Sequence, residues 1–234
     1  MASDRVVLRA KDIYKSYQTR TERIDVLLGV DLEVRRGEIV AVTGPSGVGK
    51  STLLHILGAL DRPSRGQLWL DSTEVFNMND DQVAKFRNRT VGFVFQFHYL
   101  LPEFSALENV MMPGLISGRD PEEVMETARE LLRRVGLSER MGHKPAELSG
   151  GEQQRVAVAR ALANDPLIVL ADEPSGNLDA ANSESLHRLI FELSRDLGKS
   201  FVIATHNLDL ASRTDRIVRL QRGKLINWDK GHEV

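Results

Sequence analysis

One glycine-rich segment constrains the fold of this chain more than any other feature. Residues 44–51 read Gly-Pro-Ser-Gly-Val-Gly-Lys-Ser, which fits the phosphate-loop pattern G-x-x-x-x-G-K-[ST] at every fixed position. The apolar segment 39–42 precedes this phosphate loop, and the helix-compatible segment 51–57 follows it. Because the pattern requires a strand, a loop and a helix in that order, the sequence predicts an α/β fold that binds nucleotide phosphates.

The residue types of the phosphate loop suit phosphate binding. Its glycines let backbone N–H groups converge on phosphate oxygens without obstruction by Cβ atoms. A helix that begins at Lys50 directs its N-terminal amides toward the same oxygens. We expect Lys50 to reach the β- and γ-phosphates and the Ser51 hydroxyl to ligate Mg²⁺. The predicted nucleotide-binding residues here are Gly44, Pro45, Ser46, Gly47, Val48, Gly49, Lys50, Ser51 and Thr52.

The first third of the chain is predicted to consist mostly of strands. Short β-compatible segments at 6–8, 26–28, 32–34 and 67–70 are separated by glycines. The middle of the chain is helical instead. Asp120 and Pro121 are a capping residue and a first-turn proline, and an apolar stripe follows them as far as Val135. This middle block therefore predicts a separate helical lobe.

The α/β pattern resumes near Pro166. Residues 167–171 and 201–204 are continuous apolar runs, which is typical of parallel strands buried on both faces. Asp172 and Glu173 follow the first run, and ligand sites of open α/β sheets lie at the carboxyl ends of strands. Asp172 fits the acid that phosphate-loop enzymes place beside Mg²⁺. Glu173 is suited to orient or deprotonate an attacking water. The alternative, two solvated carboxylates, is disfavoured by the phosphate loop.

A second glycine pair stands in the helical block, within Leu148, Ser149, Gly150, Gly151 and Glu152. Ser149 and Glu152 have the spacing of a capping box for a helix expected over 153–163. A helix cap does not require two consecutive glycines. We infer that these glycines leave the N-terminal amides of the helix accessible, so that they form a second surface that faces phosphate. One nucleotide needs one phosphate cradle. The segment therefore predicts either a second site or a site completed by another copy of the chain.

Taken in order, these motifs resemble those of the ATP-binding-cassette (ABC) ATPases, and the resemblance covers essentially the whole chain. The phosphate loop resembles the Walker A motif, and 148–152 resembles the signature segment. Residues 168–172 with Glu173 resemble Walker B and its catalytic glutamate. Three further matches are positional: Gln96 resembles the Q-loop glutamine, Asp179 lies in a D-loop-like segment at 175–179, and His206 resembles the switch histidine. Tyr17 sits where the family stacks an aromatic ring on adenine.

The resemblance implies ATP and Mg²⁺ as cofactors. It implies that Ser51, Gln96 and Asp172 surround the metal and that Lys50, Glu173 and His206 are catalytic. It also implies a homodimer in which the signature segment of one copy acts on the ATP held by the other. The expected architecture is a single domain over 1–234. Its nucleotide-binding α/β core, with an antiparallel β subdomain, covers about 1–95 and 160–234, and its helical subdomain covers about 97–159.

Residues 97–104, called the coupling segment below, are rich in aromatic residues and leucine. In transporters of this family, the surface around the Q-loop receives a short helix of a membrane subunit. The resemblance therefore implies that Tyr99, Leu100, Leu101 and Glu103 contact an integral membrane partner. Because no apolar run approaches the roughly 18 residues needed to cross a bilayer, we expect that partner to be a separate polypeptide. The expected location is the cytoplasmic face of the inner membrane.

The branch of the family leaves alternatives open. The coupling segment and residues 174–179 look most like the ATPases of lipoprotein-releasing complexes, while FtsE-like cell-division and MacB-like efflux ATPases are close alternatives. Some cassette ATPases act on nucleic acid or ribosomes instead. A net charge of −2 gives no basic field for nucleic acid, and the lack of cysteine excludes thiolate zinc insertions. No nucleic-acid partner is expected.

Overall fold

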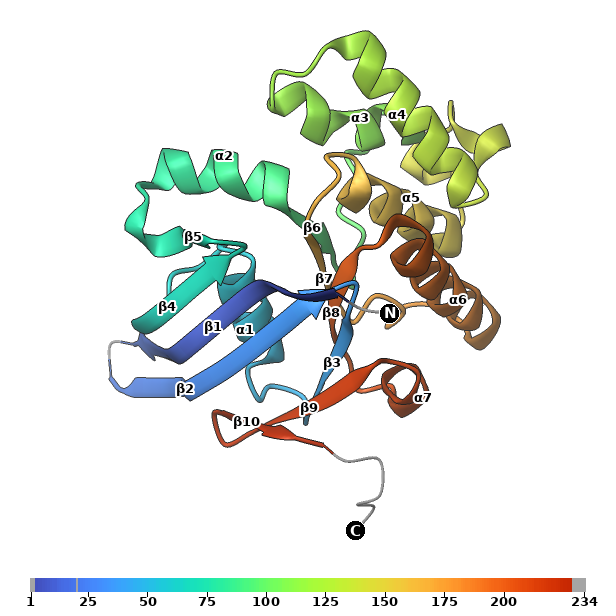
Figure 1. Cartoon of the computed structure of the whole chain (residues 1–234). Helices are drawn as coiled ribbons and strands as arrows, with labels where there is room; N and C mark the ends of the chain where they lie inside the picture. Colours follow the sequence, from blue (N-terminus) through green and yellow to red (C-terminus); the bar gives the residue numbers. More distant parts are fainter. Residues whose placement is uncertain (1–2, 20, 229–234) are drawn as a thin grey trace.

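The computed structural model describes residues 3–19 and 21–228, which fold into two sheets and a group of helices (Figure 1). The first sheet is antiparallel, and its strand order is β2-β1-β4-β5. Its strands are β1 (Ser3–Gln18), β2 (Arg23–Arg36), β4 (Arg65–Leu70) and β5 (Thr73–Glu74).

The second sheet has six strands in the order β10-β9-β3-β8-β7-β6. All its pairs are parallel except the hairpin of β9 and β10. Its strands are β3 (Ile39–Thr43), β6 (Val91–Val94), β7 (Ile168–Asp172), β8 (Ser200–Ala204), β9 (Arg216–Gln221) and β10 (Lys224–Asn227). Strands β3, β7 and β8 are buried almost throughout, as their continuous apolar sequences predict.

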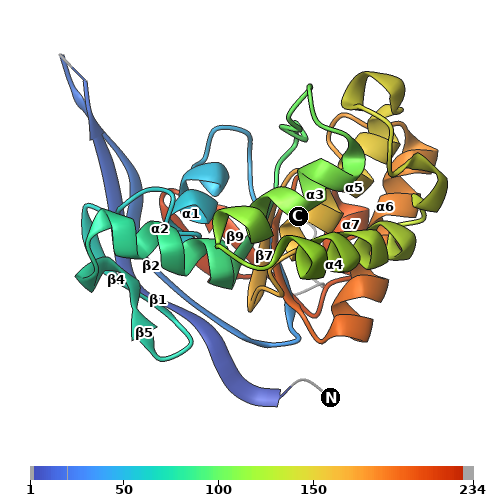
Figure 2. The same cartoon turned by 90° about the horizontal axis from the view of Figure 1, so that it is seen from above.

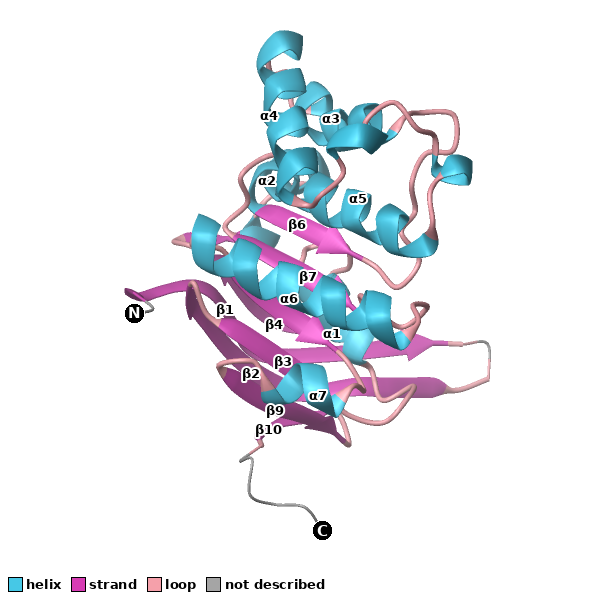
Figure 3. Cartoon of the chain, turned by 90° about the vertical axis from the view of Figure 1, so that its right-hand side faces the viewer, coloured by secondary structure: helices cyan, strands magenta, loops and turns pink. Residues whose placement is uncertain are grey.

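Helices pack against the sheets, and a group of them lies beyond the β6 edge of the parallel sheet (Figure 3). They are α1 (Lys50–Leu57), α2 (Asp80–Thr90), α3 (Ala106–Ile116), α4 (Pro121–Arg134), α5 (Gly150–Leu162), α6 (Ala180–Leu197) and α7 (Leu208–Ser212), with 3₁₀ turns at Val75–Asn77, Ser138–Arg140 and Pro145–Glu147. Within the described ranges, no helix is long and apolar enough to cross a bilayer.

Two hydrophobic clusters hold these layers together. The first surrounds α1, whose Leu53 and Ile56 are fully buried with side chains of both sheets. The second lies where α3, α4, α5 and α6 meet the parallel sheet, away from the antiparallel sheet (Figure 2). The α4 stripe enters it through Ala128, Leu131 and Leu132, as the sequence predicts. The fold class is confirmed: an α/β core with an antiparallel sheet and a helical part.

Two local predictions were wrong, and one helix was missed. Segments 26–28 and 32–34 belong to one strand, because Gly29 adopts a φ of 82° and lets β2 continue past the Tyr14 hydroxyl. Helix α2 was not predicted, since only Val83 and Thr90 of its residues are buried. Helix α5 begins at Gly150 and not at 153, because the capping box places Glu152 inside the first turn.

Candidate nucleotide-binding site

Most of the predicted site residues of the phosphate loop and Walker B line one cavity of about 410 Å³, whereas Gly44, Pro45 and Val48 do not line it. Strands β3, β7 and β8 are parallel neighbours, so their carboxyl ends open on the same edge of the sheet. The phosphate loop follows β3, Glu173 follows β7 and His206 follows β8. The cavity is lined by Ser46, Gly47, Gly49, Lys50, Ser51, Thr52, Gln96, Asp172, Glu173 and His206.

The glycines of the phosphate loop have conformations that other residues avoid. Gly44, Gly47 and Gly49 have φ values of 146°, 74° and 108°. A Cβ atom at Gly44 would lie 2.5 Å from the Leu220 carbonyl oxygen, and one at Gly49 would lie 2.6 Å from Val26 Cγ1. These two glycines are required by packing, while no atom stands within 4 Å of the Cβ position at Gly47. The loop therefore presents bare backbone to the cavity.

The Lys50 side chain is buried inside the loop that surrounds it. Its Nζ donates to the carbonyl oxygens of Gly44 at 2.9 Å and Pro45 at 3.2 Å, and it lies 3.9 Å from Glu173 Oε1. Only 8% of the residue is exposed, so its ammonium group depends on these oxygens for solvation. A cation held at this point is placed to neutralise phosphate oxygens cradled by the same loop.

Glu173 is held by groups from the neighbouring strand. Its Oε1 accepts the backbone N–H of His206 at 3.0 Å and lies 2.9 Å from His206 Nδ1, and Thr205 Oγ1 donates to Oε2 at 3.1 Å. Glu173 also has a φ of 44°, a backbone conformation that costs energy for a residue with a side chain. Thr205 was missed by sequence reasoning, since a threonine at a strand end carries no motif of its own.

Three oxygen-bearing side chains share the same cavity: the Ser51 hydroxyl, the Asp172 carboxylate and the Gln96 carboxamide. Such hard oxygen donors are the ligand class that Mg²⁺ prefers, together with phosphate oxygens and water. The residues present therefore fit a magnesium–nucleotide complex. Among the described residues, no group of three or more His, Cys, Asp or Glu is arranged to hold a metal ion by itself.

The structure places the signature segment elsewhere, because none of its residues lines the cavity. Ser149 caps α5, where its backbone N–H and hydroxyl donate to Glu152 Oε2 at 2.8 and 2.9 Å. These hydrogen bonds from Ser149, together with Arg140, lower the pKa of Glu152 although partial burial opposes them. The N-terminus of α5 is thus capped by hydrogen bonds within the chain. Ser149 and Gly150 are nevertheless exposed there.

The two glycines of the signature segment differ in their surroundings. A Cβ atom on Gly151 would lie 2.8 Å from Asn182 Oδ1, whereas one on Gly150 would meet only Leu178 Cδ2 at an ordinary 3.7 Å. That both glycines serve an external phosphate stays a prediction. Packing against Asn182 within this chain accounts for a glycine at position 151. No packing contact accounts for the glycine at position 150.

Tyr17 is not brought to the cavity. It lies near the end of β1, is 42% exposed and donates from its hydroxyl to Asp61 Oδ2 at 3.0 Å. Lys15 lies over the ring at 4.9 Å and pairs with the same carboxylate. Burial raises the pKa of Asp61, but hydrogen bonds from Lys15 and Tyr17 outweigh it, and the net pKa is lowered. Adenine stacking on Tyr17 stays a prediction.

The coupling segment exposes several apolar side chains. The exposed fractions of Phe97, Tyr99 and Leu101 are 58%, 64% and 40%, while Leu100 packs partly into the second hydrophobic cluster. Arg160 of α5 donates to the carbonyl oxygens of His98 and Tyr99, both at 2.7 Å. The segment is therefore an ordered surface that carries unburied rings.

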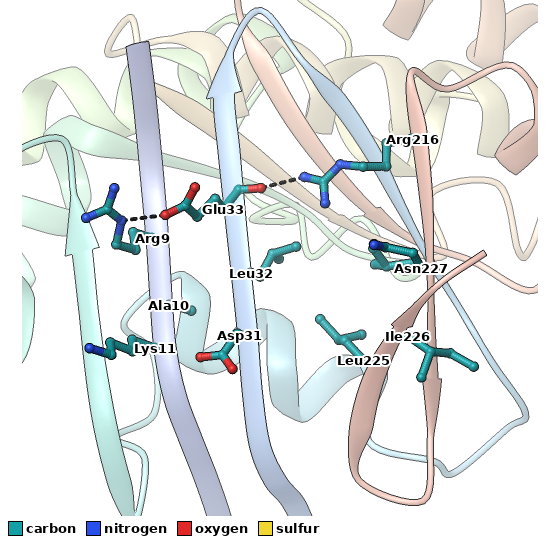
Figure 4. A pocket seen from close by; sticks show the side chains of 11 residues that line it. Arg9, Ala10, Lys11, Asp31, Leu32, Glu33, Arg216, Leu225, Ile226 and Asn227 are labelled. Atoms are coloured by element: carbon teal, nitrogen blue, oxygen red, sulfur yellow. Dashed lines mark hydrogen bonds and ion pairs between the residues drawn. The ribbon is translucent and has the colours of Figure 1, made fainter. Parts of the chain in front are cut away.

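A larger hollow of about 580 Å³ lies elsewhere, between strands β1 and β2 and the β9–β10 hairpin (Figure 4). Two of its arginines are already paired within the chain: Arg9 pairs with Glu33, and Arg216 donates to the Glu33 carbonyl oxygen and the Glu38 carboxylate. It shares no residue with the phosphate loop or the Walker B end. Its size alone does not make it the nucleotide site.

The fold and the cavity define a phosphate-loop nucleotide-binding protein. A family model described as ABC transporter matches residues 27–176, and the chain belongs to this family as one of its ATPases. Two solved structures cover 97% of this chain and 100% of their own, each with a TM-score of 0.87. They are a dimeric structure of the bacterial ABC transporter cassette MJ0796, 41% identical, and its dimeric post-hydrolysis state bound to ADP and Pi, 39% identical.

Curated relatives extend the similarity. The lipoprotein-releasing system ATP-binding protein LolD of Cytophaga hutchinsonii is 54% identical over 94% of this chain and 99% of its own length. LolD of Myxococcus xanthus is 52% identical over 94% of this chain and 98% of its own length. The lipoprotein-releasing resemblance in the sequence agrees with these relatives.

Proposed function

We propose that this chain is the ATP-hydrolysing subunit of a transporter that releases lipoproteins from the bacterial inner membrane. The main observation that supports this proposal is that residues of the phosphate loop line the same cavity as Asp172, Glu173 and His206. The LolD relatives support the lipoprotein substrate over the FtsE-like and MacB-like alternatives. A role on nucleic acid or ribosomes has no supporting observation.

Within the cavity, each residue has a distinct proposed role. The phosphate-loop amides and Lys50 bind the β- and γ-phosphates, and Ser51, Gln96 and Asp172 would hold Mg²⁺. When bound, the metal would neutralise charge on the phosphate oxygens. Glu173 orients the attacking water and accepts its proton, and His206 holds the Glu173 carboxylate from the strand beside it. Tyr17 would stack on the adenine ring.

The proposed active assembly is a homodimer. The signature segment lies outside the cavity of its own chain, and Gly150 has no packing role within it. A two-fold dimer would bring Leu148, Ser149, Gly150, Gly151 and Glu152 to the ATP of the other copy, with Asp179 between the two sites. The dimeric MJ0796 structures support this arrangement by similarity.

The proposed partners are integral membrane subunits of the LolC and LolE kind, and the proposed location is the cytoplasmic face of the inner membrane. The exposed rings of the coupling segment support a partner surface that includes Tyr99, Leu100, Leu101 and Glu103. Closure of the ATP-bound dimer would move this surface, because Gln96 at its start lines the nucleotide cavity.

The test is affinity purification of the tagged chain from the membranes of its own cells, followed by mass spectrometry and reconstitution in proteoliposomes. Copurification of integral membrane subunits and ATP-dependent release of a lipid-anchored lipoprotein support the proposal. Copurification with nucleic acid would contradict it, as would a complex with membrane subunits that hydrolyses ATP without releasing lipoprotein. The Glu173→Gln variant is the matched control that keeps the assembly and removes hydrolysis.

A further inference from the structure

A reciprocal pair of amides joins two loops that lie far apart in the sequence. Gln96 Nε2 donates to Asn177 Oδ1 at 3.1 Å, and Asn177 Nδ2 donates to the Gln96 backbone carbonyl oxygen at 3.2 Å. Gln96 also packs against Gly176, where a Cβ atom would stand 3.1 Å from Nε2. The Gln96 side chain is thus held on one flank by the 175–179 segment.

The backbone carbonyl oxygen decides which way both amides point. A carbonyl oxygen only accepts hydrogen bonds, so the Asn177 atom that faces it must be the NH₂ group. The Asn177 oxygen then faces Gln96, whose NH₂ group donates to it. The Gln96 oxygen Oε1 is the atom left over.

That remaining oxygen belongs to a residue that lines the nucleotide cavity with Ser51 and Asp172. No group among residues 3–19 and 21–228 donates a hydrogen bond to Oε1. A carboxamide that turned by 180° would offer its NH₂ group instead, which repels a cation. The orientation imposed by Asn177 therefore matters wherever Gln96 faces a metal ion.

We propose that Asn177 is a positioning residue that directs the carboxamide oxygen of Gln96, and not its nitrogen, toward Mg²⁺. This inference rests on the proposed role of Gln96 at the metal. Asn177 is bonded to Gln96 and does not itself line the nucleotide cavity, so it acts through Gln96. The same pair ties the start of the coupling segment to the segment that carries Asp179.

The test compares Asn177→Ala with Gln96→Ala and the double variant. Losing the hydrogen bond from Asn177 should raise the half-saturating Mg²⁺ concentration about two- to thirteenfold. Isothermal titration of ATP, with Mg²⁺ and with EDTA, should show weaker binding only in the presence of the metal. In the Gln96→Ala background, Asn177→Ala should add nothing further to the Mg²⁺ dependence.

A second readout needs no metal. The side-chain ¹⁵N–¹H signals of Gln96 in the nucleotide-free protein should shift in Asn177→Ala and lose their protection from exchange with water. The matched control is Asn77→Ala, which truncates an exposed asparagine bonded only to Glu74 and should change none of these quantities. Thermal melting checks that each variant is folded.

Two outcomes would overturn the inference, and they can be told apart. If Gln96→Ala raises the Mg²⁺ requirement and Asn177→Ala does not, the positioning role of Asn177 is wrong while the metal role of Gln96 stands. If neither variant changes the Mg²⁺ requirement, both are wrong. The proposed ATPase activity survives either result, because it depends on Lys50 and Glu173.

Discussion

The nucleotide cavity and the signature segment differ in how far one chain completes them. The cavity collects residues from the ends of three parallel strands, and Glu173 is bonded to both Thr205 and His206 within the same chain. The signature segment is bonded to its own helix end through the Ser149–Glu152 capping box, and to nearby Arg140 and Pro145, and it does not line the cavity. The cavity is therefore formed by residues of one chain, whereas the signature segment lies on the surface of that chain without forming a cavity with it.

The same difference separates the N-terminal ends of two helices that follow glycines in this domain. Helix α1 begins inside a loop whose glycines are required by close packing at Gly44 and Gly49. Helix α5 begins with exposed Gly150, which the packing of this chain does not require. Changes in the cavity should therefore act within a chain, and changes at the outer face of α5 should act on the neighbouring copy.

The largest effect is expected at Lys50. Replacing Lys50 with Ala removes the cation held between the Gly44 and Pro45 carbonyl oxygens, so phosphate charge would enter the loop uncompensated. We expect nucleotide affinity and steady-state hydrolysis to fall by at least about 100-fold, equivalent to about 2.7 kcal/mol. Isothermal titration calorimetry measures the affinity, and a phosphate-release assay measures the hydrolysis. Wild-type values for both would show that Lys50 is not part of the site.

Glu173→Gln should separate binding from hydrolysis. The amide keeps the shape of the side chain and loses its basicity, which is worth roughly 100- to 10,000-fold in general-base catalysis. ATP binding should persist, so the variant should accumulate as an ATP-bound dimer in size-exclusion chromatography with ATP and Mg²⁺. A variant that binds ATP normally and stays monomeric would count against the proposed dimer.

The two signature glycines provide a matched pair. In Gly151→Ala the new Cβ atom would lie 2.8 Å from Asn182 Oδ1, so this exposed side chain must shift and weaken its hydrogen bond to Asp179, which should lower the free energy of unfolding by about 0.5–1.5 kcal/mol. Gly150→Ala has room and should raise it by up to about 1 kcal/mol, since alanine is the better helix former. Despite that, Gly150→Ala should lose about tenfold in ATPase activity, near 1.4 kcal/mol. Denaturant titration measures the stability of both variants, and an ATPase assay measures their activity. A fully active Gly150→Ala would show that Gly150 has no role at the site of the other copy.

The smallest effect on the isolated chain is expected at Leu101. Its backbone is bonded to buried Asn109 while 40% of the residue is exposed, so Leu101→Arg should change stability by less than about 0.5 kcal/mol. Recovery of the membrane subunits should nevertheless fall. Ile226→Arg, at an exposed apolar position on β10, is the control that should leave recovery unchanged. Equal recovery with both variants would place the partner surface elsewhere.

Local sequence signals were sufficient for the phosphate loop and for α4, because each depends on residues close together in the chain. The continuous strand β2 and the hydrophilic helix α2 were missed, since a strand partner and tertiary contacts outweigh local propensity there. The Asn79–Gln82 capping box was the available signal for α2. Contacts such as Gln96 with Asn177 or Gly151 with Asn182 join distant segments and have no local pattern.

The central claim is that each ATP is held between the cavity of one chain and the signature segment of another. The direct test mixes Lys50→Ala with Ser149→Arg, each inactive alone. Their heterodimer has one site with both lesions and one site with neither, so the account predicts ATP-dependent heterodimers and partial recovery of hydrolysis. A mixture that forms no ATP-dependent heterodimer and is as inactive as its components would contradict it.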